Sequence, residues 1–394
     1  MSSSQAPNGA RDALQSLVAT SSALILQLED VVHKISQGQT PTTPTTPRPQ
    51  SIDALSLAHD SATLIRAHAT KLSLLIINEP FTPSAIVKVL QELVAGPIPG
   101  IASAVQVCDA ERHTAVARQD LAWRCYRVLK ELRGLVDVIP LDGKVLSAEK
   151  KDGAGGDKGS ITLTGVVWAA CDDVILLKNM GVASLLVKKV QQYHDTLQDV
   201  LDELKEWKEE GEEEQDGGEG EGEGDEDGVE YVTSQLDTTH LSAQDMLDDL
   251  MSTRHIPRDD PDKIRERLDS CLRRLRLTTL LYAAIVKRRL KVLPPLPLPQ
   301  PLAGVDAGTP APAPAPVTQR VDEVMATLKR IPEHFNEVAC SFYELEPDAI
   351  DRTMDSCFFD AFAASEMLAK PWQGEKDEFT EWVGKFQASI KKPD

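Results

Sequence analysis

The sequence predicts an all-α protein of two antiparallel helix bundles joined by an acidic disordered linker. Apolar residues recur at steps of three and four through most of the 394 residues, which is the period of an amphipathic helix. No segment alternates with period two over the length of a strand. Aromatic residues make up only 5% of the chain, which suits cores of Leu, Val, Ile and Ala better than a β-sandwich. Because Pro or Gly interrupts every stripe within about four heptads, bundles are expected rather than one long coiled coil.

The first bundle is predicted to span residues 1–209. Its helices are marked by apolar stripes, separated by breaks rich in Pro or Gly. The stripes run over Leu14–Ile35, Leu55–Ile76, Pro83 to Gly96, a short helix from Ile101, Leu121–Ile139, Leu163–Leu177 and Leu186–Trp207. Ser51 is expected to cap the second helix, and a break over Pro97–Gly100 is expected to precede the fourth. Flexible loops are expected at 40–50, where Thr-Pro repeats, and at 150–159, which is rich in glycine.

An acidic run at 210–228 is predicted to be a disordered linker between the bundles. The segment from Glu209 to Glu230 holds thirteen acidic residues and no basic one, so it carries most of the formal net charge of −20. Such a run cannot bury enough apolar surface to fold, and its like charges repel. The rest of the chain is only mildly acidic and offers no general basic face. Direct binding to nucleic acid is therefore not expected.

The second bundle is predicted to span residues 229–394. Its expected helices cover Leu241–Met251, Ile264–Ile285 after an Asp260-Pro261 cap, Val321–Phe342, Ile350–Leu368 beginning near Pro347, and Phe379–Ile390. Pro332 is expected to kink the third of these helices or to split it in two. The proline-rich stretch at 294–316 is expected to be an extended loop.

No motif for catalysis or cofactor binding is found in the sequence. The eight histidines form no H-E-x-x-H pair, the six cysteines stand singly, and neither glycine-rich run ends in Gly-Lys-Ser or Gly-Lys-Thr. The expectation is a protein that is not an enzyme, with no catalytic residue, cofactor or metal, and with reduced cysteines in its cores. No signal sequence and no uninterrupted run of about 18 apolar residues is found. The protein is therefore expected in the cytoplasm and nucleus and not in a membrane.

Three kinds of short motif allow a functional interpretation beside a structural one. Lys291, Pro294 and Pro297 have the spacing of a polyproline-II ligand for an SH3 domain, although such matches arise easily in proline-rich loops. The string Arg273-Arg-Leu275 has the R-x-L form of a cyclin docking peptide, but its leucine lies on a predicted core stripe. Four threonines that precede proline are either phosphorylation sites or plain spacer. They are Thr40, Thr43, Thr46 and Thr309.

The two helices between Leu163 and Trp207 resemble a known family. The strings Val167-Trp168-Ala169-Ala170-Cys171 and Ala183-Ser184-Leu185-Leu186-Val187-Lys188 are similar to the matching segment of the GCIP-like cyclin-D-binding proteins. The resemblance is weaker but collinear elsewhere, including the acidic insert after Trp207. The signature residues, assigned to the core, are Val167, Trp168, Ala170, Cys171, Leu186, Val190, Leu197 and Leu204.

The resemblance implies bundles similar to those of vinculin and talin rods, in a protein that binds D-type cyclins and helix-loop-helix regulators and restrains proliferation. The chain departs from the animal members in its Thr-Pro spacer, its long Glu/Gly insert and its Pro-Ala linker. The cyclin partner transfers only if the source organism has a D-type cyclin. The leading interpretation is a non-enzymatic regulator of the cell cycle or of transcription that acts through bundle surfaces. A cytoskeletal or adhesion adaptor and an acidic chaperone for basic partners are the alternatives.

Overall fold

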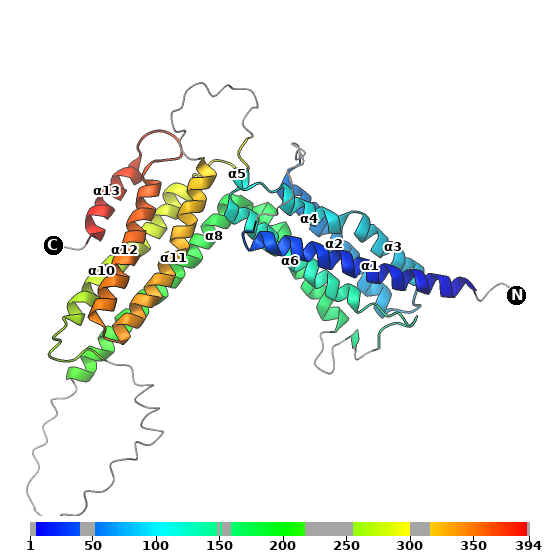
Figure 1. Ribbon diagram of the computed structural model, residues 1–394, viewed down its shortest axis with the longest axis horizontal. Coiled ribbons are helices and arrows are strands. Elements are labelled where there is room, and N and C mark those ends of the chain that lie inside the picture. The colour runs from blue at the N-terminus through cyan, green and yellow to red at the C-terminus, as the bar shows by residue number, and fades with distance from the viewer. Residues whose placement is uncertain are drawn as a thin grey trace, which may run out of the picture. The chain divides into compact units, whose positions relative to one another are not determined.

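The computed structural model describes residues 5–39, 52–147, 150–151, 159–216, 255–299 and 316–391. All regular structure within these ranges is helical, so the predicted all-α class is confirmed (Figure 1). The elements are α1 (Gln5–Ser36), α2 (Ala54–Ile77), α3 (Pro83–Ala95), α4 (Pro97–Val107), α5 (Ala110–His113), α6 (Ala115–Asp137), α8 (Ser160–Asp216), α10 (Ile264–Ile285), the π-helical turn η1 (Val286–Leu290), α11 (Val317–Tyr343), α12 (Pro347–Ala369) and α13 (Glu378–Ile390). The likeness to vinculin and talin rods stays a prediction.

The chain divides into two compact units whose boundaries differ from the predicted domains. Unit 1 comprises Met1–Lys188 and Leu293–Glu323, and unit 2 comprises Lys189–Val292 and Val324–Asp394. The difference arises because α8 and α11 each contribute to both units. α8 also continues through the expected linker start at 210 as far as Asp216. Residues 217–228, the predicted helix Leu241–Met251, the loop at 40–50 and most of the loops at 150–159 and 294–316 lie outside the described residues.

Unit 1 is a helix bundle built on the predicted stripes. α1 packs against α6 and α3, and α2 packs against α4. Ile25 of α1 and Leu132 of α6 are fully buried. Arg133 of α6 donates from Nε and Nη2 to the two carboxylate oxygens of the buried Glu29 of α1, at 2.7 and 3.2 Å. A bidentate pair of this kind fixes both distance and orientation, so it holds α1 in register with α6.

Three local predictions need correction. Asp53, rather than Ser51, caps α2, and its side chain accepts a hydrogen bond from the N–H of Leu55 at 3.1 Å; position 51 lies outside the described residues. α4 begins at Pro97 instead of near residue 101, because the first helical turn has no intrahelical acceptor for its N–H groups and so tolerates proline. Pro332 does not split α11, which is one helix.

The second half of α8 belongs to the core of unit 2. Leu197 and Leu204 are fully buried. The ring of Trp207 lies 6.4 Å from that of Phe342 and 5.4 Å from that of Tyr343, between centroids. These contacts with α11 explain why unit 2 begins at residue 189, about twenty residues before the acidic run.

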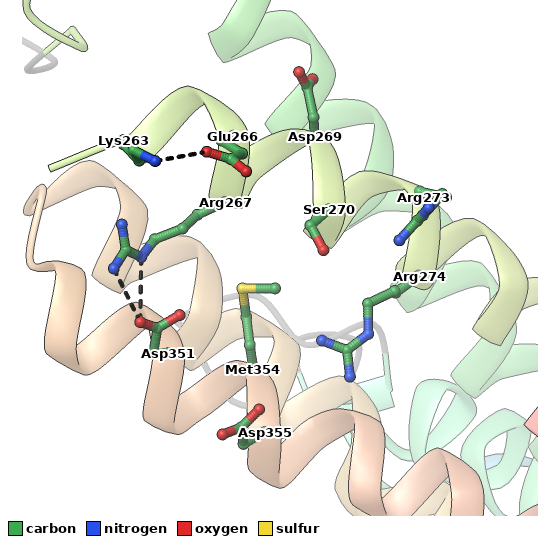
Figure 2. Close-up of a pocket in the computed structure, with 10 residues that line it drawn as sticks. All are labelled: Lys263, Glu266, Arg267, Asp269, Ser270, Arg273, Arg274, Asp351, Met354 and Asp355. Atoms are coloured by element: carbon green, nitrogen blue, oxygen red, sulfur yellow. Dashed lines mark hydrogen bonds and ion pairs between the residues drawn. The ribbon is translucent and has the colours of Figure 1, made fainter. Parts of the chain in front are cut away.

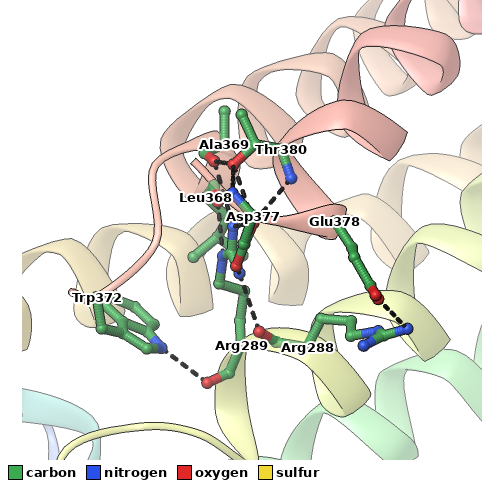
Figure 3. Close-up of polar contacts among 8 residues, drawn as sticks. All are labelled: Arg288, Arg289, Leu368, Ala369, Trp372, Asp377, Glu378 and Thr380. Carbon is green, nitrogen blue, oxygen red and sulfur yellow. Dashed lines mark hydrogen bonds and ion pairs between the residues drawn. The ribbon is translucent and has the colours of Figure 1, made fainter. Parts of the chain in front are cut away.

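A buried arginine joins the helix ends of unit 2 (Figure 3). Arg289, in η1, is fully buried and donates to both carboxylate oxygens of Asp377 at 2.6 and 3.0 Å. It also donates to the carbonyl oxygens of Leu368 and Ala369. The hydrogen bonds from Arg289 hold the pKa of Asp377 well below its ordinary value. Because the buried charge has both a carboxylate and carbonyl partners, its desolvation is compensated and it links η1 to the α12–α13 connection.

Candidate protein-interaction surface

All but one of the predicted signature residues are buried. The buried ones are Val167, Ala170, Cys171, Leu186, Val190, Leu197 and Leu204. Trp168 is 36% exposed, so its assignment to the core is wrong. The physical reason is the helical period: one step along a helix rotates the side chain by about 100°, which moves Trp168 off the stripe that Val167 occupies.

Trp168 lies at the surface where α8 meets α2. Its indole N–H donates to the hydroxyl oxygen of Thr70 at 3.1 Å. The guanidinium carbon of Arg66 lies 5.5 Å from the Trp168 ring centroid, and the Arg66 Nε lies 3.0 Å from a carboxylate oxygen of Asp172. The indole is therefore held in place while part of its ring remains open to solvent. A side chain fixed in this way loses little conformational entropy when a partner covers it.

This surface continues along both helices. Because Arg66 pairs with Asp172 and Thr70 with Trp168, the helices run antiparallel, which places Leu74 beside the turn that contains Gly165. Leu74 and Ile161 are each 52% exposed. A Cβ added at Gly165 would meet no atom within 4 Å, so the surface is open there. We define the α2–α8 surface as Arg66, Thr70, Leu74, Ile161, Gly165, Trp168 and Asp172.

A second exposed tryptophan, Trp123 on α6, offers a comparison. It is 48% exposed, and the guanidinium carbon of Arg127 lies 5.0 Å from its ring centroid. Arg127 in turn pairs with Asp173 of α8 at 2.7 Å. Within the described chain, the Trp123 indole N–H has no hydrogen-bond acceptor, so this ring is less firmly held than that of Trp168.

The cysteines of unit 1 are placed for packing. Cys108, Cys125 and Cys171 are buried, and none of the three forms a disulfide. Burial raises the pKa of the Cys171 thiol to about 12, and burial together with the two neighbouring thiols raises the pKa of Cys125 further. Protonated thiols are poor nucleophiles and poor metal ligands. In unit 2, Cys340 is exposed, contrary to the expectation that the thiols lie in the cores.

Clustered metal ligands are absent from the part of the chain that the structure describes: no group of three or more His, Cys, Asp or Glu side chains there could hold an ion.

Two stretches, Pro83–Val107 and Ser160–Gly211, are long and apolar enough to cross a membrane by length and composition alone. Core helices of soluble bundles meet the same two criteria, so these two stretches are weak evidence for a membrane span.

The predicted SH3 ligand lies on a segment that is partly tied down. Lys291 is exposed, whereas Pro294 and Pro297 are partly buried. The next residue, Leu298, donates its N–H to the carbonyl of Arg112 at 2.9 Å and accepts from the Arg112 Nε at 2.8 Å. An SH3 domain would have to bind beside this anchored backbone. The four Thr-Pro candidates, Thr40, Thr43, Thr46 and Thr309, lie outside the described residues.

Two helix bundles, one of which presents an ordered and exposed tryptophan, define a helix-bundle protein with a surface suited to protein contacts. Residues 58–210 match the family model described as "Grap2 and cyclin-D-interacting, N-terminal". The predicted resemblance is thereby confirmed over this region, which covers less than half of the chain and is similar to the N-terminal domain of the GCIP-like family. The matched region contains both exposed tryptophans and every residue of the α2–α8 surface. No match to the chain is found among curated proteins.

Proposed function

We propose that the protein is a non-enzymatic interaction regulator that binds a cyclin-type or helix-loop-helix partner through the α2–α8 surface. It acts in the cytoplasm and nucleus, in control of the cell cycle or of transcription. The observation that carries the proposal is the ordered, exposed Trp168 within the family-matched region. The description of the matched family, which names cyclin D, supports the kind of partner.

The chemistry of the surface favours an amphipathic helix as the bound element. Tryptophan is enriched among the residues that dominate binding energy at interfaces. Leu74 and Ile161 add apolar area on either side of the open position at Gly165, and helix-in-groove recognition uses such spaced apolar contacts. The charges of Arg66 and Asp172 neutralise each other at the edge. Binding should therefore depend only modestly on salt concentration.

The test is a binding measurement between the full-length protein and a purified D-type cyclin or helix-loop-helix regulator. Trp168→Ala should weaken binding at least about 30-fold, because truncating a central interface tryptophan typically costs 2 kcal/mol or more. Trp123→Ala removes a similarly exposed tryptophan from another helix and should leave the dissociation constant within about threefold of wild type. Thermal melting of both variants checks that folding is retained.

Two results would count against this proposal in different ways. If folded Trp123→Ala lost binding while Trp168→Ala kept it, the partner would use α6 and the assigned surface would be wrong. If the wild-type chain bound no partner of either class, the regulatory function itself would have to be abandoned.

A further inference from the structure

A groove between α10 and α12 of unit 2 is lined largely by charged side chains (Figure 2). It has a volume of about 490 Å³. Its lining includes four cationic and four anionic residues, together with Ser270 and Met354. It lies outside the region that matches the family model. The groove is therefore a separate feature from the α2–α8 surface.

Most of these charges are neutralised in ion pairs. One lining carboxylate pairs with Lys208, which does not line the groove, so more cationic than anionic groups of the lining stay without an ion pair. Three of the four carboxylates have a cationic partner. The pairs are Asp351 with Arg267 at 3.0 Å, Glu266 with Lys263 at 3.7 Å, and Asp269 with Lys208 at 2.8 Å. Arg273, Arg274 and Asp355 have no ion pair within the described residues. Two positive charges thus face one negative charge in the groove.

Arg274 is the most deeply buried of the cationic residues that line the groove. It is only 5% exposed, its Nε donates to the carbonyl of Ile390 at 2.8 Å, and its guanidinium carbon lies 3.8 Å from the ring centroid of Phe358. Among the residues that the structure describes, neither Nη group has an acceptor. Figure 2 shows the guanidinium extending from α10 toward α12, beside Asp355 and Met354. Burial lowers the pKa of Arg274 below its ordinary value, and the nearby Asp355 offsets only part of this effect.

We propose that this groove binds an oxyanion, a carboxylate or phosphoryl group of a small molecule, through Arg273 and Arg274 with the Ser270 hydroxyl as a further donor. A guanidinium presents its N–H groups in a planar fork that matches such oxygens. A largely buried charge without an anionic partner is costly, so a bound anion would stabilise the folded unit as well as fill the groove. Asp355 is the internal carboxylate that competes with the ligand. The phosphoryl group is expected to bind more tightly, because it carries about −1.5 to −2 charge at pH 7.

The site is tested by calorimetric titration of the full-length protein with inorganic phosphate, phosphoserine and glutamate at constant ionic strength. We expect saturable binding to one site, tightest for the two phosphoryl probes. Arg273→Ala should weaken it about tenfold, because it removes one charged donor. Asp355→Asn should tighten binding, because it removes the competing charge. The matched control is Arg276→Ala, which removes an exposed arginine of the same helix that does not line the groove and should have no effect.

Arg273, Asp355 and Arg276 are all exposed, so their variants should fold and the test does not depend on replacing the buried Arg274. Tighter binding of glutamate than of phosphate would assign the site to carboxylates and would still support an oxyanion site. The proposal is overturned if no probe saturates, if Arg276→Ala weakens binding as much as Arg273→Ala, or if Asp355→Asn weakens it.

Discussion

Asp53 combines three stabilising contacts at the start of α2. Its carboxylate accepts hydrogen bonds from the N–H of Leu55 at 3.1 Å, from the hydroxyl of Ser56 at 2.6 Å and from the ammonium of Lys178 at 2.6 Å. Burial by itself would raise the pKa of Asp53, but these hydrogen bonds outweigh burial and hold the pKa at about 2. The residue therefore acts both as a helix cap and as a link from α2 to α8.

This depressed pKa predicts a pH-dependent stability. The folded pKa lies below the unfolded value of about 3.9, so the ionised carboxylate stabilises the fold fully above about pH 4. The contribution is lost as the pH falls through about 2. Asp53→Asn should lower the free energy of unfolding at pH 7 by about 0.5–1 kcal/mol, since solvent screens this half-exposed pair, and should change little near pH 2. Urea unfolding at both pH values measures the free energy of unfolding, and Asp60→Asn, at an exposed position of the same helix, is the control. If Asp53→Asn lowered the free energy of unfolding by the same amount at both pH values, the predicted pH dependence would be wrong.

At the residue scale, periodicity identifies buried positions better than surface contacts. Val167 and Cys171 are buried as predicted, because their burial follows from the spacing of their own helix. The placement of Trp168 depends on Thr70, which lies 98 residues earlier on α2. No local pattern encodes that contact. The local signal for its exposure is that Trp168 lies one position off the apolar stripe of its helix.

At the element scale, Gly181 is the position that divides α8 into two helical segments. Its backbone has φ 77° and ψ 166°, a conformation that only glycine adopts readily. The two apolar stripes predicted this division, since their register shifts between Leu177 and Leu186. The sequence did not show that the two segments would contribute to different compact units. That follows from the packing of the second stripe against α11, which the spacing within α8 does not reveal.

A matched pair of glycine substitutions tests the role of this break. Gly181→Ala should destabilise the protein by about 1–3 kcal/mol, because alanine is strained at this φ and ψ. Gly165→Ala, in a regular part of the same helix, should stabilise it by about 0.5–1 kcal/mol. A Cβ meets no atom within 4 Å at either position, so the difference isolates backbone conformation from steric contact. Denaturant unfolding of both variants gives the two values. Equal effects would show that the break at Gly181 is not maintained in solution.

At the scale of the whole molecule, the acidic run indicates a linker but not the boundary of a unit. Charge excess shows where the chain cannot bury apolar surface, whereas a unit ends where its packing ends. The segment Leu293–Glu323 illustrates the same point, because it belongs to unit 1 although it follows the acidic run. Its Asp322 accepts hydrogen bonds from the N–H groups of Ala115 and Val116 at 2.7 and 3.1 Å, at the start of α6. Such long-range packing is not encoded in composition.

Each unit is made of two separate segments of the chain, and this predicts how fragments of the chain behave. In a fragment of residues 1–209, the stripe of Leu197, Leu204 and Trp207 would lose its partners in unit 2 and become exposed. A fragment of residues 1–188 lacks this stripe. Although it is longer, the 1–209 fragment should therefore bind more hydrophobic dye and associate more strongly. Both fragments lack Asp322, so both lose its hydrogen bonds to the start of α6. The difference in dye binding between them therefore reports the exposed stripe. Addition of a 255–391 fragment should suppress the extra dye binding of 1–209 only. Equal dye fluorescence from the two N-terminal fragments, measured at matched concentrations, would mean that the predicted boundary at 209 describes an independent domain after all.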